Sequence, residues 1–414
     1  MKGRSIEDLE SQSIDYSLIK MIVTDLQPLS IVENKGFLEY SYKLQPLYKV
    51  PNRKLLSNIM LPAKYHKIRE RLHGMLKEVS HIAVTTDMWT SDSNRAFLAL
   101  TSHFIFENKL KSAVLAATEI SEWHTAENIA AAISTIFEEW SISTKVITIV
   151  SDNGANIKKA IENLNKRHHP FVAHTLNLCV TDAIKQVSEL SALLSTCRSL
   201  VTHFKHTTLA SEQLKEMQRQ MCLPELKLKQ DVATRWNSSL IMIERLFALK
   251  QPLSAIITSL PKAPKFPNAS EWDIICDCIP VLKPAEWMTT ELSAQKYTTM
   301  SSIIPMIRGL QFTLKNEATT TSCGTDLKNA LLDVISRRLG MLDADKSYAK
   351  ATFLDPRFKK IAFGIEANAN NAQKWITDEI ASDINQENAA TASKFNKEVA
   401  PYIRKVSKKP FRQC

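Results

Sequence analysis

Glycine and paired cysteines are the two things this sequence has least of. Only 8 of its 414 residues are glycine, which argues against glycine-rich phosphate-binding loops and favours a helix-rich chain. The 7 cysteines are scattered, and no two of them form a Cys-x-x-Cys pair. We therefore expect no zinc finger, and the odd, irregularly spaced set is typical of a reducing compartment.

Long apolar runs are also missing. No stretch approaches the roughly 18 apolar residues that a membrane-spanning helix needs, and the first residues lead into no apolar run that would indicate a signal peptide. We therefore expect no membrane partner. Lys+Arg number 53 against 43 for Asp+Glu, a net charge of +10. This excess favours a polyanionic partner such as nucleic acid, although many soluble proteins carry a similar charge.

The chain is too long for one hydrophobic core, so several domains are expected. Residues 1–78 are predicted to be an N-terminal helical segment, because Leu18, Ile22 and Leu26 recur at helical spacing. Prolines then divide this segment into short pieces. Its last part, residues 54–78, is predicted to be a polar, amphipathic helix.

Residues 79–205 are predicted to be an α/β domain. Three short β-rich runs form a meander, a helix and a fourth strand follow, and then come a short strand and a long helix. The order is βββαβαβα in a mixed sheet, with these ranges: strands 81–86, 96–105 and 110–120, helix 125–140, strand 146–150, strand 171–174 and a helix to about 205. The continuous apolar run of the fourth strand is typical of a strand buried on both faces.

Residues 206–364 are predicted to be an all-α domain, because long apolar-periodic segments dominate there and strand patterns are few. These segments are 239–260, 271–293, 300–316 and 325–343. Residues 365–414 have few large apolar side chains and many Ala, Asn, Gln and Lys, so we expect a basic, loosely ordered tail. Its basic stretch at 404–410 fits a solvated end, a nuclear import signal or a phosphate contact.

Two carboxylates follow two of the predicted strands. Asp87 comes directly after the first strand and Asp152 directly after the fourth. In a sheet of this order these strands are parallel neighbours, so the two side chains meet at one edge. Paired acids there can bind Mg²⁺, which prefers hard oxygen ligands. The alternative is that each Asp only caps a following turn or helix, and the pattern alone leaves both interpretations open.

Seven short segments follow one another between about residues 20 and 360: 25–37, 85–91, 151–156, 173–178, 234–238, 291–305 and 353–359. The second reads Thr85-Thr86-Asp87-Met88-Trp89, and the third reads Ser151-Asp152-Asn153-Gly154. In sequence and in order, the set resembles the hAT transposase superfamily, especially the BED-type zinc-finger proteins domesticated from it.

The resemblance implies a ribonuclease H-like core interrupted by a large all-α insertion domain. It implies that Asp87 and Asp152 are the first two of three catalytic, metal-binding acids, with Mg²⁺ as the cofactor. It also implies that Arg235 and Trp236 contact DNA, and it places His174 near the site as a further DNA-binding residue. Without the resemblance, Trp236 is better explained as a core residue or as a neighbour of a helix cap, and His174 as a structural histidine.

The sequence departs from the family at three places. No BED-finger ligands lie before residue 80, Phe171 stands where the family usually has Cys, and residues 365–414 show no match to the third acid or the dimerisation region. We therefore expect a truncated, nuclear, DNA-binding descendant that does not complete cleavage, with the N-terminal helices as the remaining candidate region for a homodimer. Two alternatives stay open: an active Mg²⁺-dependent nuclease whose Glu is supplied elsewhere, and a protein-interaction scaffold without DNA binding.

Overall fold

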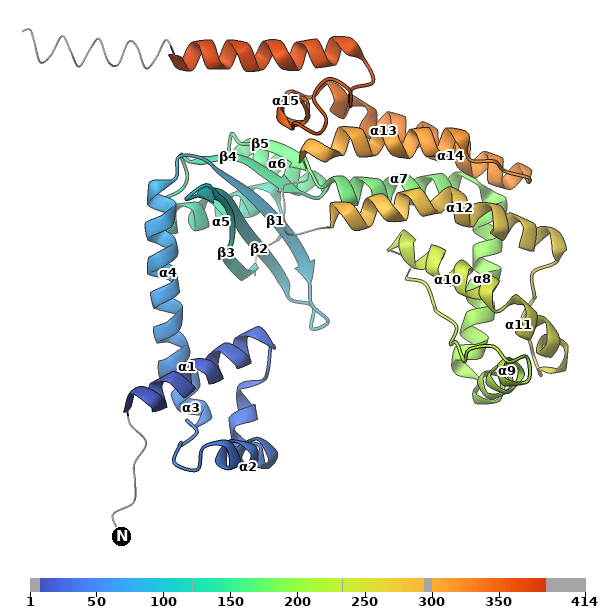
Figure 1. Ribbon diagram of the computed structural model, residues 1–414, viewed down its shortest axis with the longest axis horizontal. Coiled ribbons are helices and arrows are strands. Elements are labelled where there is room, and N and C mark those ends of the chain that lie inside the picture. Colours follow the sequence, from blue (N-terminus) through green and yellow to red (C-terminus); the bar gives the residue numbers. More distant parts are fainter. Residues whose placement is uncertain (1–7, 121–122, 233, 294–299, 385–414) are drawn as a thin grey trace, which may run out of the picture. The chain divides into compact units, whose positions relative to one another are not determined.

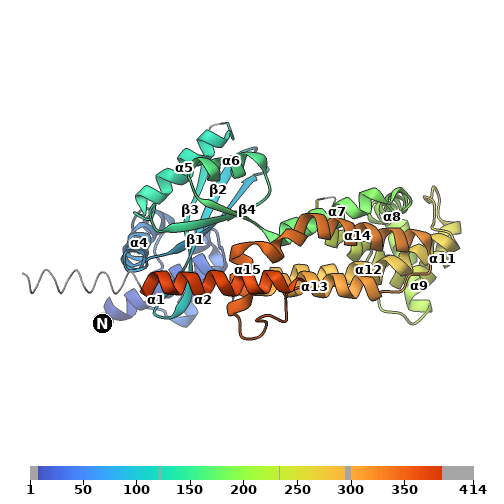
Figure 2. The ribbon, with the colours of Figure 1, turned by 90° about the horizontal axis from the view of Figure 1, so that it is seen from above.

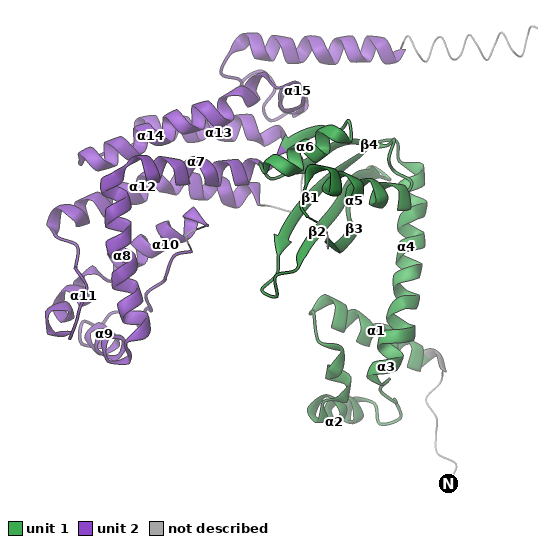
Figure 3. Cartoon of the chain, turned by 180° about the vertical axis from the view of Figure 1, so that it is seen from behind, with its two compact units in different colours: residues 1–169 green, residues 170–414 purple. Residues whose placement is uncertain are grey.

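The computed structural model describes residues 8–120, 123–232, 234–293 and 300–384. The chain divides into two compact units, residues 1–169 and 170–414, which Figure 3 shows in different colours. Each unit has its own hydrophobic core. The division into four segments at residues 78, 205 and 364 stays a prediction.

The first unit begins with short helical elements, as the spacing of apolar residues and prolines predicted. They are α1 (Asp8–Thr24), η1 (Leu29–Glu33), α2 (Lys35–Leu44), α3 (Arg53–Leu55), η2 (Leu56–Met60) and α4 (Leu61–Glu78). A small apolar cluster holds the first of them together: Leu18, Ile19, Ile22, Val32 and Leu56. The last three elements run on from one another and match the amphipathic helix expected at 54–78.

A mixed sheet of five strands follows, in the spatial order β3-β2-β1-β4-β5. Its strands and two intervening helices are β1 (Ile82–Thr90), β2 (Ala96–Phe106), β3 (Lys109–Ile120), α5 (Ala126–Glu139), β4 (Val146–Ser151), α6 (Ala155–Asn163) and β5 (Arg167–Pro170). The first three strands form the antiparallel meander expected from the sequence. Glu107 and Asn108 join the last two with φ values of 50° and 58°, which is the two-residue turn that suits strand twist.

The register of the sheet decides where the acids lie. Strand β4 runs parallel to β1, and Thr85 pairs with Val150. Ile82, Val84 and Thr86 are buried on the face that α5 and α6 cover (Figure 2). Because side chains alternate along a strand, Asp87 belongs to the opposite face. Asp87 lies two residues beyond Thr85 in the sequence, and Asp152 lies two residues beyond Val150.

Four details of the sheet were predicted wrongly. The first strand continues to Thr90 and does not end at residue 86, so Asp87 lies inside β1 and does not follow it. The last strand lies at 167–170 rather than 171–174, and Phe171 instead precedes α7 (Val172–Gln186). Leu176, Cys179 and Ala183 are buried along that helix, and their spacing is helical, a pattern that the short β-like run at its start obscured. The expected long helix ends at Val187, where α8 (Ser188–His206) begins. Strand β4 is not buried on both faces, since Ile147 is 54% exposed.

The described rest of the second unit is mainly helical, as the apolar periodicity predicted. Its elements are α9 (Thr208–Gln220), α10 (Trp236–Ala248), α11 (Lys250–Ile256), η3 (Ile257–Ser259), α12 (Ala269–Leu292), α13 (Met300–Asn316), α14 (Ser322–Leu339), η4 (Gly340–Ala344) and α15 (Lys346–Leu354). Figure 1 labels the α-helices among them. Helices α7 and α8 contribute buried residues to the same core. None of the helices described is long and apolar enough to cross a membrane.

The expected loosely ordered tail is wrong for its first part. Residues 366–384 are helical, and Ala369 and Ala372 are buried in the core of the second unit. Alanine is the best helix former, so a segment with few large apolar residues can still form a helix when its small side chains pack closely. Residues 385–414, including the basic stretch, lie outside the described residues.

Candidate functional site

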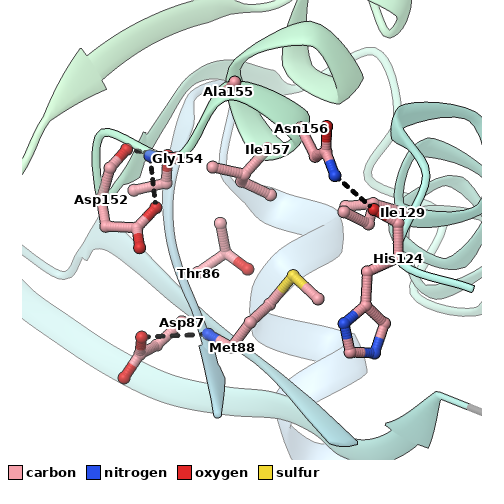
Figure 4. A pocket seen from close by; sticks show the side chains of 11 residues that line it. Thr86, Asp87, Met88, His124, Ile129, Asp152, Gly154, Ala155, Asn156 and Ile157 are labelled. Atoms are coloured by element: carbon pink, nitrogen blue, oxygen red, sulfur yellow. Dashed lines mark hydrogen bonds between the residues drawn. The ribbon is translucent and has the colours of Figure 1, made fainter.

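The two acids of the first unit line one pocket at the carboxyl ends of β1 and β4. Its volume is about 280 Å³. Figure 4 shows Asp87 and Asp152 on one side of this pocket, with Thr86 between them and the helices. The sequence therefore placed both carboxylates at the same end of the sheet correctly, while their catalytic role stays a prediction.

Each carboxylate makes one local hydrogen bond. Asp87 Oδ1 accepts from the N–H of Met88 at 2.9 Å, and Asp152 Oδ1 accepts from the N–H of Gly154 at 3.0 Å. Helix α6 starts after Gly154, so Asp152 stabilises the turn before the helix rather than capping it. Both local roles involve Oδ1, which leaves Oδ2 of each residue available to a ligand. Local capping and metal binding are therefore compatible here.

The donor chemistry fits a magnesium ion. Two carboxylates that line one open pocket offer the hard oxygen ligands that Mg²⁺ prefers, with room for water in its other positions. Among the described residues, however, no group of three Asp, Glu, His or Cys side chains is arranged to hold a metal ion. The pocket thus offers two carboxylates, and no third ligand joins them in the described part of the chain.

A serine and a histidine fix the backbone at Asp152. Ser151 Oγ donates to the carbonyl oxygen of Asp152 at 3.0 Å and lies 3.0 Å from Nε2 of His168 on β5. Burial lowers the pKa of His168 below its ordinary value, nearby Lys158 lowers it further, and Asp152 opposes both effects. His168 is therefore neutral at pH 7 and acts here as a hydrogen-bonding partner.

The three predicted DNA-binding residues all lie in the second unit, close to one another. The side-chain oxygen of Asn177 on α7 accepts a hydrogen bond from the backbone N–H of Trp236 at 3.3 Å. The side-chain nitrogen of Asn177 donates to the backbone carbonyl oxygen of Thr234 at 3.5 Å. His174 lies one turn before Asn177 on the same helix, so the two residues share a face. Arg235 precedes the first residue of α10.

The structure separates the roles of Arg235 and Trp236. Arg235 is exposed, and its guanidinium makes no ion pair with any residue that the structure describes. Trp236 is only 4% exposed and belongs to the core of the second unit. An indole in that position cannot stack on a base, so the predicted DNA contact of Trp236 does not fit this structure, and the core interpretation does.

Several pocket residues were not predicted. Thr86, His124 and Asn156 line the pocket beside the acids, and Thr86 is 2% exposed. The alternation of β1 carried a signal for Thr86, because a polar residue in phase with Ile82 and Val84 must face the core. No sequence pattern predicted that His124, which precedes α5, lines the same pocket as residues of β1.

Comparison with known proteins gives matches to two family models and to several relatives. Residues 85–178 match the model of the ZBED1 RNase-like domain, and residues 170–279 match that of the ZBED1 RNase-like helical domain. The chain is 29% identical over 398 residues to the Homo sapiens zinc finger BED domain-containing protein 4, and 24% identical over 399 residues to the putative AC transposase of Zea mays. Its relatives are hAT transposases and BED-type zinc-finger proteins. The resemblance stated from the sequence is thereby confirmed.

The match covers most of this chain and a smaller part of each relative. It takes in 92% of the chain and 34% of the Homo sapiens protein, and 87% of the chain and 47% of the Zea mays protein. The chain therefore spans less than half the length of these relatives. The first family model includes Asp87 and Asp152, the second includes Arg235 and Trp236, and both include His174.

Proposed function

We propose that this chain is a nuclear DNA-binding protein derived from a hAT transposase. The observation that carries the proposal is that Asp87, on β1, and Asp152, directly after the parallel strand β4, line one pocket. The relationship to transposases and the net charge of +10 support the same proposal, a DNA-binding protein of this origin. In this reading the sheet is a ribonuclease H-like core, the helices after it are its insertion domain, and the N-terminal helices are the region for any homodimer.

We also propose that the chain does not cleave DNA by itself. When bound at the two acids, Mg²⁺ would activate a water and stabilise the leaving oxygen. In this chain Asp87 and Asp152 would hold the ion, with Ser151 and His168 fixing the backbone of Asp152. No third acid joins the pair among the described residues, so a second ion lacks the ligand that would fix it.

The cleavage proposal predicts that the purified chain leaves DNA intact. Hairpin DNA and transposon-end DNA are incubated with the chain and 5–10 mM Mg²⁺ or Mn²⁺, roughly saturating for a weak site, and products are separated on a denaturing gel. The expected result is no cutting above that of the Asp87→Ala variant. Metal-dependent cutting that Asp87→Ala abolishes would overturn the proposal and favour an active nuclease.

DNA binding is proposed to depend on Arg235. Its guanidinium is exposed, has no ion pair with the described residues, and stands at the start of α10, whose first residue is anchored in the core. Such a side chain can grip a phosphate at two points. His174, one turn from the asparagine that fixes this segment, is proposed to contact the same DNA.

Arg235→Ala is predicted to weaken DNA binding about tenfold at low salt, because a hydrogen bond to a charged group contributes about 1.5–3 kcal/mol. It should also reduce the slope of log affinity against log salt by about one phosphate contact. Fluorescence anisotropy with a labelled duplex at several salt concentrations measures both.

Arg219→Ala is the matched control for this measurement. It removes the same charge from the same unit, but Arg219 is already paired with Glu216 and Glu225, so a small effect is expected. Equal losses for the two variants would mean that only overall charge matters. If the wild-type chain forms no salt-sensitive complex, the scaffold alternative replaces the proposal.

A further inference from the structure

A pocket of the second unit lies between helices α8 and α9 and the segment that leads from α9 toward α10 (Figure 1). Its volume is about 290 Å³. Four apolar side chains line it: Phe204 and Leu214 are buried, and Leu226 and Leu228 are half-buried. None of the residues predicted to contact DNA is among its lining residues. Walls of this kind accept an apolar group rather than a bare ion.

The wall made by residues 226–228 is fixed in place, although it belongs to no helix or strand. The fully buried side chain of Gln218 on α9 donates to the carbonyl oxygen of Leu226 at 3.3 Å and accepts from the Leu226 N–H at 2.8 Å. Arg245 on α10 donates to the carbonyl oxygen of Lys227 at 2.8 Å. The pocket is therefore formed before a partner arrives, which lowers the entropic cost of binding.

Burial alternates along the same segment. Leu226 and Leu228 are half-buried, whereas Lys227 and Lys229 are exposed, a pattern that is typical of an extended chain. The backbone groups of Leu228 and Lys229 make no hydrogen bond to another residue that the structure describes. An extended segment with free backbone groups beside an apolar pocket suits a second extended peptide, which can pair with the backbone and place a side chain in the pocket.

Lysines give the pocket a positive charge. Lys205, Lys215 and Lys227 all line it, and Lys215 forms an ion pair with Glu212 at 2.8 Å. Lys205 and Lys227 are exposed and form no ion pair within the described ranges of the chain. The two further acids of this stretch are both paired with Arg219. Uncompensated positive charge therefore lies beside apolar walls, and the complementary ligand is acidic and apolar at once.

We propose that this pocket binds an acidic peptide segment of another protein through one large apolar side chain. That side chain enters the pocket, and the acidic residues next to it meet Lys205 and Lys227. The lysine stems extend the apolar wall while their ammonium groups reach the carboxylates. Single-stranded DNA is the competing polyanion, but its bases bind by stacking on exposed aromatic rings. Phe204, the one aromatic residue in the lining, is buried.

The experiment titrates the full chain with a peptide in which one leucine stands between pairs of glutamates. Methyl NMR of the leucines follows the titration, because it reports on Leu226 and Leu228 separately. Their signals should shift with about millimolar affinity, which burial of one apolar side chain and two exposed ion pairs can supply. The signal of Leu331, buried on α14 and outside the pocket lining, should not move.

Two altered peptides separate the apolar contribution from the charged one. Serine in place of the leucine should weaken binding about tenfold, because the apolar burial is lost. Lysines in place of the glutamates should abolish the shifts. A serine peptide that binds as well as the leucine peptide would show that charge alone attracts it, and the pocket proposal would be wrong.

Variants of the chain test the location. Lys205→Glu and Lys227→Glu should each weaken binding about fivefold, since an attraction becomes a repulsion. Ser211→Leu, at a half-buried position in the lining, fills the pocket and should weaken it at least as much. Lys315→Glu is the matched control, an exposed lysine on α13 outside the pocket lining. Equal losses for Lys315→Glu and Lys227→Glu would overturn the proposal, and an unmoved Leu331 signal confirms that each variant is folded.

Oligothymidine, titrated in the same way, decides between the two polyanions. The peptide should shift Leu226 and Leu228 at lower concentration than the single strand does. If only the single strand shifts them, the pocket belongs to nucleic acid and the peptide proposal is overturned. Peptide binding by a chain that binds no duplex DNA would overturn the proposed function and leave this pocket intact.

Discussion

Trp236→Ala is expected to destabilise the second unit by about 3–5 kcal/mol, the usual cost of truncating a buried tryptophan. The indole is 4% exposed and packs in the core at the first residue of α10, so its loss leaves a large cavity. For a unit of this size the melting temperature should fall by about 10 °C. Scanning calorimetry or a thermal melt followed by circular dichroism measures it.

The conservative variant distinguishes a core residue from a DNA contact. Trp236→Phe keeps most of the buried ring and removes an indole N–H that has no partner among the described residues, so stability should change little. Its DNA affinity should stay within about twofold of the wild type, because Arg235 keeps its place. An unchanged melting temperature for Trp236→Ala, with a large loss of DNA affinity, would restore the predicted base-stacking role.

The sheet and the acid pair were predictable because short-range patterns specify them. Alternation of apolar residues gives the three strands of the meander, and the order of the elements makes β1 and β4 parallel neighbours. Asp87 and Asp152 then come to one pocket because Asp152 directly follows β4 and Asp87 lies in the last part of the neighbouring strand β1. The error at Ile147 has the same origin, since an apolar run alone does not reveal that one face of the strand is left uncovered.

The contacts around the site were harder to predict, because they join residues that are far apart in the sequence. The family motif shows Arg235 and Trp236 side by side, yet one is exposed and the other is in the core. That difference follows from how α7 and α10 meet at Asn177. The hydroxyl of Thr86 likewise has no partner because no described donor or acceptor lies within hydrogen-bonding distance of it. The sequence does not predict that absence.

A buried carboxylate in the second unit also lay outside sequence prediction, and it carries a large expected effect. Asp277 on α12 is 7% exposed. Its Oδ2 accepts from the N–H groups of Thr320 and Thr321 at 2.9 and 2.7 Å and from the Thr321 hydroxyl at 2.6 Å, and its Oδ1 accepts from the Thr320 hydroxyl at 3.1 Å. Gly324 belongs to the same arrangement, because a Cβ there would lie 2.6 Å from Asp277 Oδ2. The carboxylate thus fixes the turn that begins α14.

Asp277→Ala is expected to cost about 3–5 kcal/mol, since hydrogen bonds to a charged group contribute about 1.5–3 kcal/mol each and the donors of the exposed Thr320 can bind water instead. Asp277→Asn keeps the volume but sets an N–H₂ group against donors, so an intermediate loss is expected. Burial acts to raise the pKa of Asp277, but the hydrogen bonds from Thr321 and Thr320 outweigh burial and hold the pKa below its ordinary value.

Because the pKa is lower in the folded state, the carboxylate stabilises the fold fully above the ordinary Asp pKa of about 4. This contribution is lost as the pH falls through the lower, folded value. The difference in melting temperature between the wild type and Asp277→Asn should therefore be constant from pH 7 to about pH 5 and shrink below about pH 4. A difference that does not shrink on acidification would show that packing at this turn, and not the ionised carboxylate, stabilises the second unit.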